Sequence, residues 1–133
     1  MESMMEASEM YRKYNILIAD NNKYFLNAFK FYLEKIFSEK IGNICTTNNG
    51  NHALNLIKTN TFDIAFIALF LIGINGIEFT KKASELNLKL SIIAVLFSDE
   101  LIFISEMIKA GAKNYIFKEE IDKKNLNKIF LIE

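Results

Sequence analysis

The sequence predicts one α/β domain with a doubly wound, five-stranded parallel sheet in the strand order 2-1-3-4-5. The chain has 133 residues, of which 51% are hydrophobic, and this is enough to fill one ordinary core. Short apolar runs alternate along it with longer stretches of helical periodicity. Short turns join these segments. Alternating strands and helices of this kind form right-handed strand–helix–strand crossovers, and such crossovers lead to the doubly wound topology.

Five short segments are the expected strands. Residues 15–20 form a continuous apolar run that ends at an acidic residue, and residues 62–70 are the most apolar run in the chain. We expect residues 62–70 to form a central strand that is covered on both faces, as in parallel sheets generally. The remaining strands are expected at residues 42–47, 90–97 and 114–118.

The segments between the strands have the periodicity of amphipathic helices. After the first strand, apolar residues at spacings of three and four predict one buried face, made of Phe25, Ala28, Phe29, Tyr32, Leu33 and Ile36. Further helices are expected around residues 53–57, from Gly76 or Ile77 onward, and over residues 122–132. A helix up to Ala110, with its N-cap at Ser98–Asp99, completes the set.

Composition and charge narrow the class of protein. Sixteen Lys and Arg balance sixteen Asp and Glu, so direct nucleic-acid binding is disfavoured. No apolar run approaches the roughly 18 residues that cross a membrane. The single cysteine, Cys45, excludes an intramolecular disulfide and suits a reducing compartment. We therefore expect a cytoplasmic protein with a flexible leader at residues 1–13 and one domain at residues 14–133.

Four segments resemble the receiver domain of two-component response regulators, over about residues 15–132. Residues 16–21 resemble its first strand, which ends in an acidic pair, and residues 62–76 resemble the strand and loop around its phospho-accepting Asp. Residues 91–97 resemble its fourth strand. Residues 110–118, Ala-Gly-Ala-Lys-Asn-Tyr-Ile-Phe-Lys, are similar to its A-G-A-x-x-[YF]-x-x-K segment, the most specific match. The resemblance implies a CheY-like three-layer sandwich and a role in signalling.

The resemblance also implies functional positions at the carboxyl ends of the strands, where ligands bind in such sheets. In the family, an Asp accepts a phosphoryl group from a histidine kinase beside a Mg²⁺ held by carboxylates, and a Ser or Thr and a Lys then contact the phosphoryl group. By position, Asp20 and Asn21 match the acidic pair, and Ala68 matches the accepting Asp. Leu96 matches the Ser or Thr, and Lys118 matches the Lys.

At Asn21, Ala68 and Leu96 this sequence differs from the residue types of the family, and the differences change the expected chemistry. A methyl side chain at position 68 cannot attack phosphorus, and Leu96 cannot donate a hydrogen bond to a phosphoryl oxygen. Asp20 remains as the one anionic ligand, whereas Mg²⁺ prefers several oxygen ligands, typically including carboxylates. We therefore expect a degenerate, non-enzymatic pseudo-receiver with no cofactor and no metal. We expect Asp20 and Lys118 to form a structural ion pair, in preference to a residual anion or metal pocket.

Asp63 and Ser98 are two candidate replacements for the missing acceptor and hydroxyl. Asp63 precedes position 68 by five residues, about 16 Å at ~3.3 Å per residue, and is too far away to act as an acceptor. Ser98 could replace the lost hydroxyl, but capping the fourth helix is the favoured role. Glu119 stands where the family usually has a Pro.

The apolar run at residues 101–104 predicts an exposed interaction surface. Consecutive helical residues turn by 100°, so these four cannot all face the sheet. We expect Ile102 and Phe103, with Tyr115 on the fifth strand, to bind a protein partner or a second copy through the face formed by the fourth helix, fifth strand and fifth helix.

Two other functions stay open on the sequence alone. The chain could be a phosphorylatable response regulator that uses an unorthodox phosphoryl site. It could also be a flavodoxin-like binder of a small molecule, with a pocket at Ala68, Leu96 and Phe97. We rank the small-molecule binder last.

Overall fold

A computed structural model describes residues 12–132 of the chain. Most of the expected leader, residues 1–11, lies outside the described residues. The five strands pair in parallel as one sheet in the order β2-β1-β3-β4-β5, which confirms the predicted topology. They are β1 (Tyr14–Ala19), β2 (Ile41–Thr47), β3 (Ile64–Ala68), β4 (Ser91–Leu96) and β5 (Asn114–Phe117).

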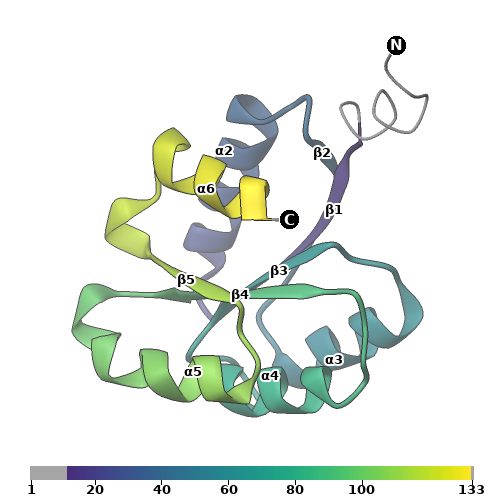
Figure 1. The fold of residues 1–133 in the computed structure, drawn as a ribbon, viewed down its shortest axis with the longest axis vertical. Helices are drawn as coiled ribbons and strands as arrows, with labels where there is room; N and C mark the ends of the chain where they lie inside the picture. The colour runs from purple at the N-terminus through teal and green to yellow at the C-terminus, as the bar shows by residue number, and fades with distance from the viewer. Residues whose placement is uncertain (1–11, 133) are drawn as a thin grey trace.

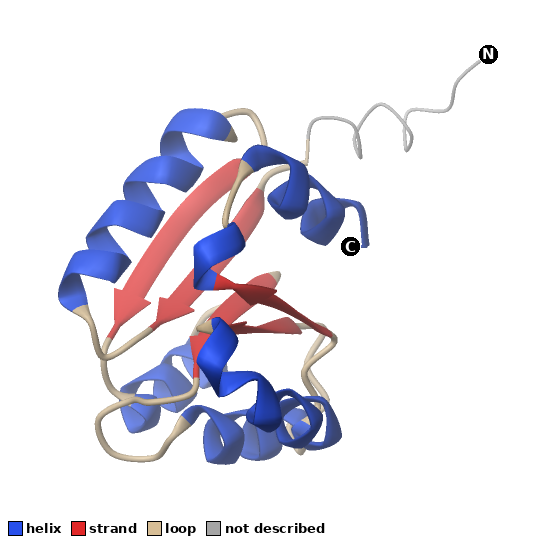
Figure 2. Ribbon diagram, turned by 90° about the vertical axis from the view of Figure 1, so that its left-hand side faces the viewer, coloured by secondary structure: helices blue, strands red, loops and turns tan. Residues whose placement is uncertain are grey.

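Helices cover both faces of the sheet. α2 and α6 lie against one face, and α3, α4 and α5 lie against the other (Figures 1 and 2). Two short 3-10 helices, η1 and η2, follow β4 and β5 directly. The bounds are α2 (Lys23–Ile36), α3 (Gly50–Thr59), α4 (Gly76–Ser84), η1 (Ser98–Phe103), α5 (Ile104–Ala110), η2 (Lys118–Glu120) and α6 (Lys123–Ile132). None of the helices within residues 12–132 is long and apolar enough to cross a membrane.

The alternation of side chains along the strands builds two hydrophobic cores. Ile16 and Ile18 of β1 join Phe66 in the core beneath α2 and α6. Leu17 and Ala19 point to the opposite face and join the core beneath α3, α4 and α5. Because both faces are covered, all five residues of β3 are buried, as expected for a central parallel strand.

The buried face of α2 differs from the predicted one. Leu26, Phe29 and Leu33 are buried, whereas Ala28 and Ile36 are exposed. The buried residues follow the spacing i, i+3, i+7, which is a narrower stripe than the six residues that the sequence predicted. Apolar spacing alone gave a face that was too wide, because the sheet determines which part of a broad apolar surface is covered.

The chain leaves the third strand earlier than expected. The sequence predicted a strand over residues 62–70, but β3 ends at Ala68 and Phe70 is exposed. The Gly76 amide donates to the Leu69 carbonyl at 2.8 Å and closes the loop that follows β3. A Cβ at Gly76 would lie 2.0 Å from the Ala68 carbonyl oxygen, so this close approach requires glycine.

Ser98 does not cap the fourth helix, which corrects the prediction. It is the first residue of η1, and α5 begins only at Ile104. The Ser98 hydroxyl donates a hydrogen bond to the Glu119 carboxylate, and a charged acceptor forms a stronger bond than a neutral backbone group. The end of the helix is as predicted, since Gly111 follows it with a φ of 129°.

Candidate functional site at the carboxyl edge of the sheet

The sheet register brings the residues predicted at the carboxyl ends of the strands to one edge. Ala19 pairs with Ile67, so Asp20, which directly follows β1, lies beside Ala68, the last residue of β3. Leu96 is the last residue of β4, and Lys118 directly follows β5. Strand pairing therefore places four side chains at one edge although they are far apart in sequence.

Asp20 and Lys118 form the predicted ion pair. Lys118 Nζ lies 2.6 Å from Asp20 Oδ2, and the two side chains are 10% and 1% exposed. The other carboxylate oxygen, Oδ1, accepts a hydrogen bond from the Asn22 amide at 2.9 Å. Oδ1 thus has a hydrogen-bond partner, whereas the buried Oδ2 has the ion pair with Lys118 and no hydrogen bond within residues 12–132. The ammonium neutralises a charge that would be costly to bury alone.

Two aromatic rings enclose the Lys118 ammonium. Nζ lies 4.4 Å from the centroid of the Phe25 ring and 4.5 Å from that of the Phe97 ring. These distances fall within the range of cation–π attraction. The sequence did not predict this contact, although an aromatic residue directly after β4 was a usable signal. The ammonium is held by one carboxylate and two rings.

Ala68 and Leu96 are closed to solvent. Ala68 is 4% exposed and Leu96 is fully buried in the core beneath α3, α4 and α5. Asn21, by contrast, is exposed. Neither apolar side chain can supply an oxygen or a hydroxyl at this edge, and the structure buries both of them.

Carboxylates hold the two backbone amides at the end of β4. Glu100 Oε1 accepts from the Phe97 amide at 2.7 Å. Both Glu119 oxygens lie 3.0 Å from the Ser98 amide. The hydrogen bonds from the Ser98 hydroxyl and amide lower the pKa of the Glu119 carboxyl, because they stabilise its ionised form. The sequence showed Glu119 only as a replacement for Pro and did not predict these contacts.

The edge does not fit a magnesium ion. Mg²⁺ takes oxygen ligands in near-octahedral geometry, but the Asp20 carboxylate already pairs with an ammonium and an amide. Ala68 offers no side-chain ligand, and Asn21 is neutral. Within residues 12–132, no three His, Cys, Asp or Glu side chains gather where they could hold a metal.

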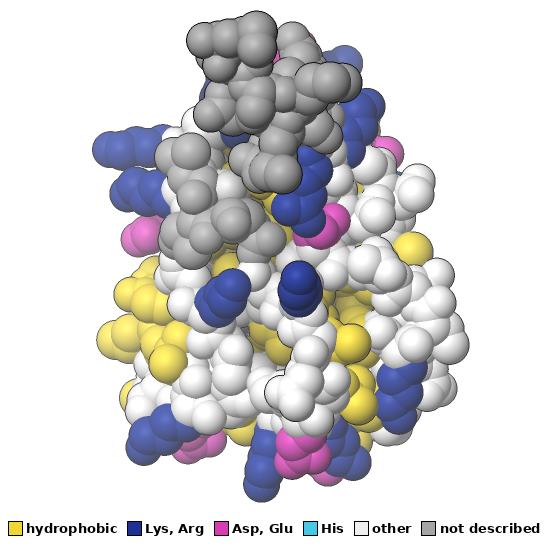
Figure 3. Space-filling model, turned by 45° about the vertical axis from the view of Figure 1, so that its right-hand side comes forward, with side chains coloured by type: hydrophobic (Ala, Val, Ile, Leu, Met, Phe, Trp, Pro, Cys, Tyr) yellow, Lys and Arg dark blue, Asp and Glu magenta, His cyan; other side chains and the backbone are white. Residues whose placement is uncertain are grey.

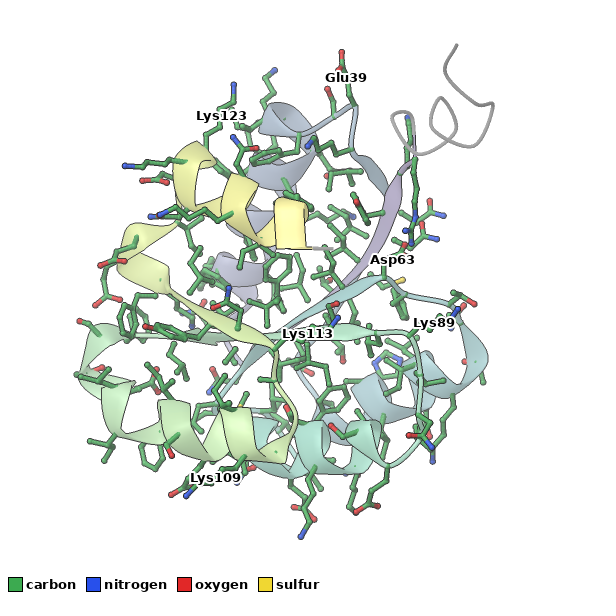
Figure 4. All side chains as sticks on the ribbon, viewed as in Figure 1. Glu39, Asp63, Lys89, Lys109, Lys113 and Lys123 are labelled. Atoms are coloured by element: carbon green, nitrogen blue, oxygen red, sulfur yellow. The ribbon has the colours of Figure 1, made fainter. Side chains whose placement is uncertain are left out.

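Asp63 lies at the opposite end of the sheet from Lys118. It directly precedes β3, near the start of β1 (Figure 4). Its carboxylate pairs with Arg12, and Oδ2 accepts from the Asn15 amide at 2.8 Å. These contacts give Asp63 a structural role in joining the start of the domain to β3.

The predicted interaction residues lie on η1 and β5. Ile102 is 77% exposed and Leu101 is 57% exposed, while Phe103 is half-buried. Tyr115 is exposed, and its ring lies 5.5 Å from that of Phe117. The face shown in Figure 3 also carries patches of hydrophobic side chains between charged groups. Two of the three predicted residues are thus open to solvent.

Comparison with known proteins identifies related sequences over most of the chain. The family model described as "Response regulator receiver domain" matches residues 16–130. The response regulator UvrY of Escherichia coli strain K12 is 25% identical over 104 residues, which cover 78% of this chain and 47% of UvrY. The chain therefore spans about half the length of the curated relatives it matches.

Solved structures share the fold. A CheY-like response regulator receiver domain protein from Methanospirillum hungatei JF-1 has a TM-score of 0.77 and 24% identity, covering 90% of this chain and 92% of that one. The receiver domain of the sensor histidine kinase PA1611 from Pseudomonas aeruginosa PAO1 has a TM-score of 0.77 at 16% identity, covering 90% and 96%. That structure has a magnesium ion coordinated in its active-site cleft.

Proposed function

We propose that this chain, which belongs to the response regulator receiver domain family, is a pseudo-receiver: a non-enzymatic, cytoplasmic protein-interaction module of two-component signalling that acts without phosphorylation. In this proposal, Asp20, Asn21, Ala68, Leu96 and Lys118 are the remnants of a phosphorylation site. The assignment of Ala68 is supported by its place at the end of the central strand and by the tight contact of Gly76 with its carbonyl.

The buried ion pair is the observation that carries the proposal. A phosphoryl acceptor needs a nucleophilic oxygen that can reach phosphorus, and the carboxylate at this edge is buried and bonded. Asp20 Oδ2 lies 2.6 Å from the Lys118 ammonium, and Phe25 and Phe97 flank that ammonium. A phosphoryl group entering here would have to displace an internal partner of each charge. The edge is therefore suited to stability and not to phosphotransfer.

The amides at the end of β4 give independent support. Backbone N–H groups at the carboxyl ends of strands are natural ligands of phosphoryl oxygens. Here Glu100 accepts from the Phe97 amide, and Glu119 accepts from the Ser98 amide. Two carboxylates of the chain occupy donors that an incoming phosphoryl group would otherwise use, and their negative charge would repel it.

We test the absence of phosphotransfer by intact-mass spectrometry after incubation with acetyl phosphate and Mg²⁺. A receiver domain that carries the accepting Asp serves as the positive control. We expect no phosphoryl adduct on this chain under conditions that label the control. An adduct that maps to the edge around Asp20 would overturn the proposal and favour a response regulator with an unorthodox acceptor.

The proposed interaction surface consists of Ile102, Phe103 and Tyr115. Because Ile102 is largely exposed, Ile102→Glu should leave the fold intact while placing a charge at the centre of the surface. We expect this variant to lose self-association or partner capture from a source lysate. Leu88→Glu, at an exposed apolar residue between α4 and β4, is the matched control. Equal binding by the wild type and the Ile102 variant would refute this surface.

A further inference from the structure

The segments that follow β4 and β5 are tied together residue by residue. Phe97 and Ser98 follow β4, and Lys118 and Glu119 follow β5. The Phe97 ring packs over the Lys118 ammonium, and the Ser98 amide and hydroxyl both donate to the Glu119 carboxylate. The two residues that directly follow β4 therefore contact the two residues that directly follow β5.

We propose that the Ser98–Glu119 contact is a built-in latch that holds η1 in the arrangement in which Ile102 and Phe103 of the proposed interaction surface face a partner. The inference rests on the proposed function, since it explains how that surface is presented without a phosphoryl group. In this role Glu119 is a positioning residue for the interaction surface.

The latch matters because η1 has hydrophobic anchorage at one end only, where the half-buried Phe103 packs against the core beneath α3, α4 and α5. None of the six residues from Ser98 to Phe103 is buried, and 3-10 geometry gives weaker hydrogen bonds than an α-helix. A segment of this kind keeps one conformation only if its ends are fixed. Glu100, which accepts from the Phe97 amide, fixes the first turn from within, and Glu119 fixes it to the other junction.

Two donors of one residue converge on the Glu119 carboxylate. A carboxylate that accepts from an amide and a hydroxyl of the same residue forms charge-assisted hydrogen bonds. The lowered pKa of Glu119 has the same origin, with the Ser98 hydroxyl as its largest cause. The carboxylate is therefore ionised at neutral pH, and the latch is closed without any signal.

The latch also connects the two halves of the interaction surface. Ile102 and Phe103 lie within η1, and Tyr115 lies on β5, three residues before Lys118. A contact between the ends of β4 and β5 thus fixes η1 relative to β5. The partner meets a surface whose parts are already in register, which lowers the ordering cost of binding.

Amide hydrogen exchange of the whole chain tests the latch directly. Glu119→Gln keeps the size of the side chain but removes its charge and one acceptor oxygen. We expect exchange at residues 98–103 to accelerate at least about threefold, while the amide of the fully buried Phe66 stays as protected as in the wild type. Glu120→Gln, at the neighbouring exposed carboxylate, should leave exchange unchanged. Unchanged exchange in Glu119→Gln would overturn the latch.

Binding then tests the role of the latch. The probe is the set of proteins that the wild type retains from a source lysate and that Ile102→Glu does not. We expect Glu119→Gln to retain this set less well than Glu120→Gln does. If exchange accelerates but retention is unchanged, the latch does not position the surface and this inference fails, while the proposed function stands. If Ile102→Glu retains everything the wild type does, the proposed surface itself fails.

Discussion

Removing the Lys118 ammonium should destabilise the protein far more than removing a surface charge does. Lys118→Met keeps an apolar side chain of similar length but leaves the Asp20 carboxylate, which is 1% exposed, without its counter-ion. Breaking a buried pair by removing one partner costs about 3–5 kcal/mol. Two cation–π contacts are lost as well, at ~0.5–2 kcal/mol each. Part of the loss is recovered because the Met thioether packs well against aromatic rings.

We therefore expect Lys118→Met to lower the free energy of unfolding by about 4 kcal/mol, measured by urea denaturation at neutral pH. Adding Asp20→Asn should restore about 2 kcal/mol, because the amide oxygen still accepts from the Asn22 amide and no charge remains buried. Lys109→Met, at an exposed lysine on α5 (Figure 4), should change stability by no more than about 0.5 kcal/mol.

The result that refutes this reasoning is a small loss. A cost below about 1 kcal/mol for Lys118→Met is what an exposed ion pair gives. It would mean that water reaches Asp20 once the lysine is gone, so the edge is not closed. An additive double variant would likewise show that the two side chains are not coupled.

Three further outcomes follow from individual contacts. Carboxyl carbon shifts in NMR should show Glu119 titrating below its ordinary pKa of 4.5. Its hydrogen bonds should therefore stabilise the fold fully above pH 4.5, and this stability should be lost as the pH falls through the lowered pKa. Ser98→Ala should return the midpoint of the titration toward 4.5, and a wild-type midpoint at or above 4.5 contradicts the contact. Gly76→Ala should cost at least about 2 kcal/mol in urea unfolding, because its Cβ meets the Ala68 carbonyl oxygen, and a neutral effect would show that the loop can shift. Phe79→Ala should cost about 3–5 kcal/mol, because its ring is fully buried between α4 and the sheet, and a markedly lower thermal midpoint checks this.

Local patterns were sufficient for the topology. Continuous apolar runs such as residues 15–20 predicted buried strands, and Gly111 marked the end of a helix with a positive φ that L side chains rarely adopt. Parallel strands joined by helices permit few arrangements, so the strand order followed. The expected ion pair between Asp20 and Lys118 followed from the same topology, because strand ends meet at one edge.

Where the sequence predictions failed, the deciding contacts join residues far apart in the chain. The sequence predicted that Ser98 caps its own helix. Instead, its hydroxyl donates a hydrogen bond to the carboxylate of Glu119, which is 21 residues away. The buried stripe of α2 depends on which side of the helix the sheet covers, which periodicity cannot specify once most positions are apolar.

The sequence by itself determined the alternation of strands and helices, the edge at which the polar residues gather, and the presence of an alanine at position 68. These depend on residue type, periodicity and chain direction, which are local properties. Only the tertiary structure decided that Phe25 and Phe97 enclose Lys118 and that Glu119 holds Ser98. Such contacts arise when separate strand ends are brought within a few ångströms of each other, and no local pattern encodes which side chains then meet.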